Sequence, residues 1–257
     1  MPGALSTDLY ELTMAAGYVA MGADKTRATF ELFVRDLPAT RGYLVAAGLE
    51  QAICYLETWR CTPDEIAYVR TLSALRGAAP EFFDDYLPRL RFTGDVWAVP
   101  EGTPVFAGEP IVRVTAPLPE AQLVETALLA TILFQTSIAS KAARVTQAAG
   151  GRPVSEFGGR RAHGTQAAMC AARAACLAGC QSTSNVEAGY RYGVPVSGTM
   201  AHSWVMAQTD ELTAFERFMT IYGEQSVLLI DTYDSVAAAR HIVGAGLRPA
   251  GVRLDSG

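Results

Sequence analysis

A pair of arginines, Arg160 and Arg161, follows two glycines near the middle of the sequence. The glycines would let a ligand approach the backbone closely, and planar guanidinium groups match the geometry of phosphate or carboxylate. Adjacent arginines are also common on ordinary protein surfaces, but this pair comes directly after a stretch that is typical of a strand. The pair is therefore open to two interpretations, an anion-binding site or exposed surface residues.

His202 is the histidine whose position best suits chemistry. It lies between Thr199 and Ser203, where we expect a strand to end and a helix to begin. Small neighbours leave an imidazole accessible, and imidazole can act as an acid, a base or a phosphoryl acceptor. His163 follows the arginine pair and either positions it or is a loop residue without function. His241 falls in a helical stretch, which favours a structural or surface role.

Three carboxylates come after expected strands: Asp231, Asp234 and Asp255. Helix capping explains Asp231 or Asp234 without any chemistry, because both precede a helical stretch. The functional interpretation is that such carboxylates hold ribose hydroxyls or Mg²⁺. Capping explains Asp255 less well, since it directly follows the apolar stretch 252–254 where the sequence ends.

Three other polar residues are candidate site residues only because of their positions in the expected elements. Ser184 and Asn185 form another expected turn after a strand, and a helix cap is the alternative interpretation. Tyr10 lies between the acidic residues Asp8 and Glu11 in an expected first helical turn. It could be a core residue, a surface residue or a stacking face for a ligand.

An alternation of strands and helices would position most of these residues. We expect a long helix over 120–149, then apolar strands at 153–157, 194–197, 226–230 and 251–254, with helices at 164–179, 185–192, 210–221 and 234–244. This pattern predicts parallel strands with crossover helices, in an open sheet or a barrel. In such folds ligands bind at the carboxyl ends of the strands, where the candidates occur.

The first part of the sequence has a different pattern of expected helices and strands. A helix is expected to start near the polar cap candidates Ser6, Thr7 and Asp8, and alternation over 28–34 predicts a mostly buried strand. Thr62 to Glu65 form a capping box with proline at the first helical position, and shorter strands are expected at 96–99 and 111–115. We therefore predict an N-terminal α+β domain over residues 1–118 and an α/β domain over residues 119–257.

Composition excludes several classes of protein. The chain has 26 acidic and 21 basic residues, a net charge of −5, which argues against nucleic acid or an anionic membrane as partner. Lys25 and Lys141 are its only lysines and neither lies in a phosphate loop of the Walker type. We expect no signal peptide, because residues 1–10 are polar, and no membrane span, because no apolar run reaches about 20 residues.

The cysteines point to a cytoplasmic protein. The five cysteines form no CxxC pair, and an odd number fits reduced thiols better than disulfides. Cys176 and Cys180 could share one helix face and bind a metal. We expect no metal site there, because no histidine accompanies them and buried cysteine usually acts as a small apolar residue.

Together the motifs resemble those of the nicotinate phosphoribosyltransferases, a type II phosphoribosyltransferase family of NAD synthesis. TDLYELTM, FGxRRxHG and GTxAHS are specific only in combination. The similar segments occur in family order over essentially the whole chain, at 7–14, 31–35, 122–126, 134–136, 156–164, 183–185, 197–204 and 252–257.

The resemblance implies a fold and a reaction. Family members have an N-terminal α/β domain beside an irregular, open α/β barrel, and work as homodimers with active sites shared across the interface. They join nicotinate to 5-phosphoribosyl-1-pyrophosphate (PRPP), which gives nicotinate mononucleotide and pyrophosphate. The reaction is coupled to ATP hydrolysis and uses Mg²⁺, in the salvage of NAD.

The resemblance also assigns roles to residues near the end of the sequence. His202 is similar to the family histidine that ATP transiently phosphorylates. Thr199 is similar to a nicotinate contact, and Asp255 resembles a carboxylate near the ribose.

Earlier residues receive substrate-binding roles on the same basis. Tyr10 resembles the tyrosine that stacks on nicotinate, where it reaches the partner subunit's site. Arg160 and Arg161 are similar to the arginines that face the phosphates and the substrate carboxylate. Ser184 and Asn185 match the family motif as substrate-binding residues.

The sequence departs from the family in two places. Gly159 stands where family members more often have a larger residue, and the sequence stops after Leu254 to Gly257, where the family continues through further strands and glycine-rich phosphate loops. We therefore expect a barrel that is incomplete at its C-terminal side. The alternatives are a related enzyme that uses quinolinate or nicotinamide, or a non-catalytic fragment of such an enzyme.

Overall fold

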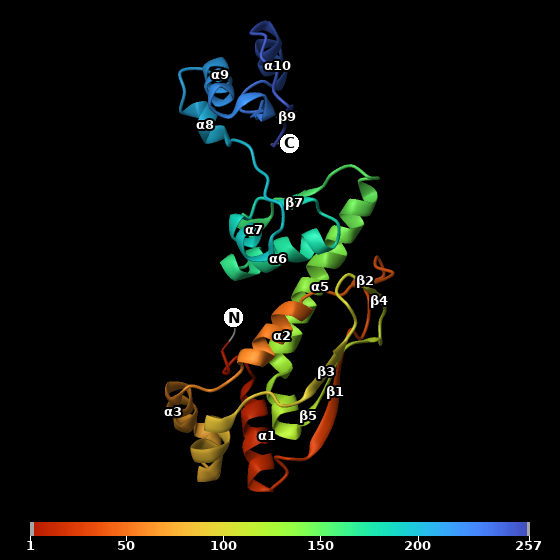
Figure 1. Cartoon of the computed structure of the whole chain (residues 1–257), viewed down its shortest axis with the longest axis vertical. Coiled ribbons are helices and arrows are strands. Elements are labelled where there is room, and N and C mark those ends of the chain that lie inside the picture. Colours follow the sequence, from red (N-terminus) through yellow and green to blue (C-terminus); the bar gives the residue numbers. More distant parts are fainter. Residues whose placement is uncertain (1–2, 256–257) are drawn as a thin grey trace. The chain divides into compact units, whose positions relative to one another are not determined.

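The computed structural model of the protein describes residues 3–255. The chain divides into two compact units, unit 1 over Met1–Val196 and unit 2 over Ser197–Gly257 (Figure 1). In the described part, no helix is both long enough and apolar enough to cross a membrane. The predicted domain division between residues 118 and 119 falls after the first residue of helix α4 (Leu118–Leu123), and it stays a prediction.

Capping residues place the first helices of unit 1. Helix α1 (Leu9–Ala20) begins after Asp8, whose backbone N–H donates to the Glu11 carboxylate at 3.1 Å. Helix α2 spans Leu49–Thr58. Helix α3 (Pro63–Thr71) has the predicted capping box, because the Thr62 N–H donates to Glu65 at 2.7 Å and the Glu65 N–H donates back to Thr62. The starts of α1 and α3 are therefore confirmed.

An antiparallel sheet of order β1-β5-β3 accompanies these helices. Its strands are β1 (Arg27–Phe33), β3 (Asp95–Ala98) and β5 (Pro110–Pro117). The strand expected over 28–34 is confirmed as β1, but its expected burial is wrong, because within β1 only Leu32 is buried. Strand β1 lies at the edge of the sheet, whereas the central strand β5 buries four apolar side chains. The short strands β2 (Leu44–Val45) and β4 (Pro104–Val105) form a separate antiparallel pair.

The helix expected over 120–149 is two helices. Helix α4 (Leu118–Leu123) and helix α5 (Glu125–Ala148) meet at the fully buried Val124, whose ψ of −7° departs from the helical value of about −42°. Short helical turns also occur at η1 (Ser73–Leu75), η2 (Phe82–Tyr86), η3 (Leu87–Arg89) and η5 (Gly223–Gln225).

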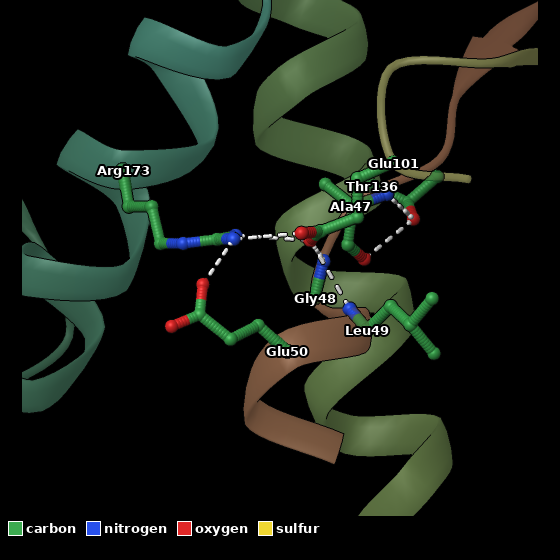
Figure 2. A network of polar contacts seen from close by, with 7 residues as sticks. All are labelled: Ala47, Gly48, Leu49, Glu50, Glu101, Thr136 and Arg173. Atoms are coloured by element: carbon green, nitrogen blue, oxygen red, sulfur yellow. Dashed lines mark hydrogen bonds and ion pairs between the residues drawn. The ribbon is translucent and has the colours of Figure 1, made fainter. Parts of the chain in front are cut away.

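A largely buried ion pair connects three segments of unit 1. Figure 2 shows Arg173 reaching from helix α6 (Thr165–Leu177) to Glu101, with contacts of 2.9 and 2.6 Å to the two carboxylate oxygens. The same carboxylate accepts hydrogen bonds from the N–H groups of Gly48 and Leu49 at the start of α2. Arg173 also pairs with Glu50 at 2.5 Å. We call this group the Arg173 clasp.

The later part of unit 1 contains two short parallel strands. Strand β6 (Ser155–Glu156) pairs with β7 (Ser182–Thr183), and the turn η4 (Gly159–Arg161) and helix α6 connect them. Helix α7 (Val186–Tyr192) follows β7. The strand expected at 194–197 is reduced to a single bridge between Val196 and Thr183, and β7 is a strand that the sequence analysis did not predict.

Unit 2 is a strand–helix–strand arrangement with two further helices. Parallel strands β8 (Val227–Leu229) and β9 (Gly251–Arg253) are joined by helix α10 (Ser235–Gly244). Helices α8 (His202–Met206) and α9 (Glu211–Tyr222) precede them, and the helix start expected at His202 is confirmed. The core includes Phe215, Leu228 and Leu229, all fully buried.

The predicted fold class is confirmed. The described residues combine an N-terminal α+β part with parallel strands joined by helices, and their sheets are open rather than closed into a barrel.

Candidate functional site

The carboxyl ends of β8 and β9 form a polar cluster in unit 2. Asp231 follows β8 and Asp255 follows β9, and the two strands are parallel, so both loops lie at one edge of the sheet. The Asp255 backbone N–H donates to the Asp231 carboxylate at 2.6 Å, which ties the two loops together. Asp231 does not cap a helix, whereas Asp234 caps α10 by accepting from the N–H groups of Val236 and Ala237.

His202 is fixed within this cluster by its imidazole nitrogens. It is the first residue of α8, and its Nδ1 lies 3.1 Å from the Thr232 hydroxyl. Its Nε2 lies 3.8 Å from the Asp255 carboxylate. About 32% of the His202 side chain is exposed, so a ligand can reach the ring. His241, by contrast, is exposed on α10.

Arg253 joins the remaining predicted residues of unit 2. Its guanidinium donates to the Asp255 carboxylate at 2.5 Å and to the Thr199 hydroxyl at 3.0 Å. The structure thus brings Thr199, His202 and Asp255 together, with Arg253 and Thr232 as connecting residues. Neither connector was predicted from the sequence. Arg253 could have been found in the sequence as a charged residue within a short apolar strand.

The arginine pair lies at the end of β6 in unit 1. Arg160 and Arg161 are exposed on η4, and Arg161 lines a pocket of about 290 Å³ together with Glu156 and His163. Among residues 3–255, no salt bridge involves either arginine. Both guanidinium groups are therefore available to an anion, as the functional interpretation requires.

The turn after β7 lies beside the arginine pair. Asn185 caps α7, because its side-chain oxygen accepts from the Ala188 N–H at 2.9 Å, as the helix-cap interpretation expects. Its side-chain nitrogen lies 3.8 Å from the position that a Cβ at Gly159 would occupy. The exposed Ser184 donates its backbone N–H to the Glu156 carbonyl at 3.0 Å.

Tyr10 lies apart from the arginine pair within unit 1. Its neighbour Glu11 accepts from Thr126, at the start of α5, whereas α6 packs on the same helix near Ala139 through Ala174. At 1.5 Å per residue these contacts are about 20 Å apart along α5. Tyr10 is about 48% exposed, and its hydroxyl donates to Glu11 at 3.4 Å.

Electrostatics keep the Tyr10 phenol neutral. Desolvation and the carboxylates of Glu11 and Glu125 raise the pKa of Tyr10 to about 12. A neutral phenol ring that is half exposed can offer a flat face to an aromatic ligand.

Burial disfavours the reactive thiolate form of Cys176 and Cys180. Cys176 and Cys180 are free thiols, and burial raises the pKa of both. In the described part of the chain, no group of three or more His, Cys, Asp or Glu side chains is arranged to hold a metal ion.

The structure predicts that a larger residue at position 159 is tolerated. A Cβ on Gly159 would meet its nearest atoms at 3.8 Å, and Gly159 does not have a positive φ. We expect Gly159→Ala to leave the free energy of unfolding unchanged or to raise it by about 0.4–1 kcal/mol, because alanine restricts the unfolded chain. Urea denaturation measures this. Gly164→Ala is the control that should destabilise, since Gly164 has a φ of +108°.

Comparisons with known proteins agree on one family. The sequence is 49% identical over 261 residues to the nicotinate phosphoribosyltransferase pncB2 of Mycobacterium tuberculosis, which covers 99% of this chain and 55% of that protein. It is 45% identical to the nicotinate phosphoribosyltransferase of Bacillus subtilis, over 98% of this chain and 52% of that protein. The chain therefore spans about half the length of the curated relatives that it matches.

The fold agrees with a solved structure. The crystal structure of human nicotinic acid phosphoribosyltransferase superimposes with a TM-score of 0.86 at 31% sequence identity, and covers 98% of this chain and 61% of the human one. The family model for the N-terminal domain of nicotinate phosphoribosyltransferase matches residues 5–133, and the model for the nicotinate phosphoribosyltransferase family matches residues 153–254. On this evidence the chain belongs to the nicotinate phosphoribosyltransferase family.

Proposed function

We propose that this chain is the part of an enzyme that joins nicotinate to PRPP, with nicotinate mononucleotide and pyrophosphate as products, in the salvage of NAD. Because the chain spans about half the length of its relatives, the proposal concerns the full-length protein, which we place in the cytoplasm as a homodimer with shared active sites. The observation that supports it best is the network that holds Thr199, His202 and Asp255 together at the ends of β8 and β9.

The chemistry of the transfer explains the types of residue. Positive charge develops on the ribosyl C1 as pyrophosphate leaves, so the site must stabilise anions. Arg160 and Arg161 suit this because guanidinium groups bind phosphate and carboxylate with two hydrogen bonds each. Ser184 and Asn185 lie beside the pair and would contact the same substrate. Asp255 would stand near the ribose, where a carboxylate favours the developing positive charge.

Orientation of the base is assigned to Tyr10 and Thr199. A flat aromatic face holds a pyridine ring so that its nitrogen points at C1 of the ribose. Such orientation lowers the activation barrier, because the entropy of positioning the reactants is lost on binding rather than in the transition state. Tyr10 is exposed and neutral, as a stacking residue should be, and in the proposed dimer it serves the partner subunit's site. The Thr199 hydroxyl would contact nicotinate.

We assign the coupling to ATP to His202. Its ring is held at Nδ1 and a third of the side chain is exposed, which suits a transient phosphoryl acceptor. In that step the γ-phosphoryl group of ATP forms a bond to an imidazole nitrogen, and ADP leaves. This assignment follows the family resemblance of the segment 198–203.

The carboxylates of unit 2 fit Mg²⁺ bound together with substrate. Mg²⁺ is usually held by one or two carboxylates plus substrate phosphates, rather than by a complete protein site. Asp231 and Asp255 supply two carboxylates at one edge of the β8–β9 pair. Bound there, the ion would neutralise negative charge on the phosphates.

A comparison of three bases tests the proposed function. We expect the full-length protein to release pyrophosphate from PRPP with nicotinate, and at least about 100-fold more slowly with nicotinamide, since nicotinamide lacks the carboxylate that an arginine would bind. Quinolinate, a dicarboxylate, should need more clustered cations than Arg160 and Arg161. Equal or faster release with nicotinamide or quinolinate would favour that related enzyme, and no release with any base would contradict the proposed function.

A further inference from the structure

The arginine pair and the Ser184–Asn185 turn are attached to neighbouring strands. In the parallel pair β6–β7, Glu156 lies opposite Thr183. Paired residues of adjacent strands place their side chains on the same face of a sheet. Each of the two residues is followed within two positions by a segment to which we assign substrate binding. We call residues 158–164 the arginine loop.

The Glu156 carboxylate makes one hydrogen bond toward each segment. One oxygen accepts from the Gly158 N–H, at the start of the arginine loop, at 2.5 Å. The other accepts from the Thr183 hydroxyl at 2.7 Å. Both oxygens thus accept from neutral donors, and the carboxylate forms no salt bridge with Arg160 or Arg161 among the described residues.

Thr183 links the Glu156 carboxylate to the Ser184–Asn185 turn. Its side chain is fully buried, and its hydroxyl accepts from the Asn185 N–H at 3.0 Å while it donates to Glu156. A hydroxyl can donate once and accept, so both contacts coexist. The Glu156 carbonyl adds a third link by accepting from the Ser184 N–H at 3.0 Å.

We propose that Glu156 is a positioning residue that fixes the arginine loop against the Ser184–Asn185 turn through the Thr183 hydroxyl. The inference rests on the proposed function, because it concerns residues assigned to bind the substrates. A carboxylate beside two arginines would ordinarily compete with an anionic ligand for them. Here both of its oxygens are engaged by the Gly158 N–H and the Thr183 hydroxyl, so it holds the loop and leaves the guanidinium groups to the ligand.

The test uses conservative changes on strands β6 and β7. Thr183→Val removes the hydroxyl and Thr183→Ser retains it, while Glu156→Gln retains the shape but turns one acceptor into a donor. Ser155→Ala is the matched control, because its hydroxyl bonds to the Ser182 hydroxyl at 2.7 Å on the same two strands, outside the proposed connection. Each variant is made in the full-length protein.

We expect Thr183→Val and Glu156→Gln to raise the KM for nicotinate or PRPP by about 10-fold to 100-fold, because small displacements of binding groups are costly. Thr183→Ser should restore the KM, and Ser155→Ala should leave it unchanged. The double variant Glu156→Gln/Thr183→Val should raise the KM no more than the more affected single variant does, since both changes break the same connection. Unchanged KM values, or a change equal to that of Ser155→Ala, would overturn the proposal.

Hydrogen exchange separates this inference from the proposed function. Amides of residues 157–164 and 184–185 should exchange faster in Thr183→Val than in the wild type and in Ser155→Ala, whether or not the protein transfers a phosphoribosyl group. If the wild type is inactive and these amides still exchange faster, the proposed function fails and the connection stands. If exchange is the same in all three proteins, the connection is wrong.

Discussion

Replacing Arg173 with methionine is expected to lower the free energy of unfolding by about 3 kcal/mol. Removing one partner of a buried ion pair leaves the other charge buried without compensation, which costs about 3–5 kcal/mol. Arg173 is 12% exposed and Glu101 is 15% exposed, so solvent screens the pair little. At about 2–4 °C per kcal/mol for a chain of this size, the melting temperature should fall by about 6–12 °C.

The Arg173 clasp also makes a prediction about pH. Burial opposes ionisation of Glu101, but hydrogen bonds from Arg173, Gly48 and Leu49 outweigh it and hold the pKa of Glu101 below its ordinary value of 4.5. A carboxylate with a lowered folded-state pKa stabilises the fold above its unfolded pKa, and this stability is lost as the pH falls through the folded pKa. The difference in stability between wild type and Arg173→Met should therefore be largest near pH 7 and shrink as the pH falls below 4.5.

Arg191→Met is the matched control for this prediction. Arg191 pairs with Glu187 one helical turn away, and both side chains are at least half exposed. Such a pair contributes about 0.3–0.5 kcal/mol, so the variant should unfold almost as the wild type does. Urea denaturation of the three proteins at pH 7 and pH 4 gives the comparison. Equal stability of the two variants would show that the clasp does not stabilise unit 1.

Local signals predicted the elements that local interactions form. The start of α3 followed from a capping box that spans four residues, and the start of α1 followed from polar cap candidates near Asp8. The β8–α10–β9 arrangement followed from its alternating pattern. The break at Val124 was missed because its cause lies in one backbone angle of a buried residue. The burial of β1 was wrong because an apolar alternation does not reveal which strand lies at the edge of a sheet.

The sequence did not reveal which residues far apart in the chain contact one another. Arg173 and Glu101 are 72 residues apart, and nothing in the local pattern of either residue indicates the other. His202 was singled out by its flanking residues, yet Thr232, which orients its ring, is 30 residues further along. Residue types and strand ends therefore predicted the members of the unit 2 cluster, while the contacts that hold them required the folded chain.

Replacing His202 with alanine is expected to abolish the nicotinate-dependent hydrolysis of ATP. If the γ-phosphoryl group passes to this imidazole, no other side chain can replace the covalent step. Incubation with γ-labelled ATP should place an acid-labile label on the full-length wild type and none on His202→Ala. His241→Ala is the control, because that histidine is exposed on α10 and should leave both labelling and hydrolysis unchanged.

The surroundings of His202 explain why its phosphorylation would change the site. A phosphoryl group adds about −1.5 to −2 charges, next to an Asp255 carboxylate that lies 3.8 Å from Nε2 and is paired with Arg253. Repulsion would then act on Asp255, and Arg253 links that carboxylate to Thr199 at 3.0 Å. Loss of the histidine should therefore remove the effect of ATP on nicotinate affinity while basal transfer remains. Undiminished nicotinate-dependent hydrolysis in His202→Ala would refute this role.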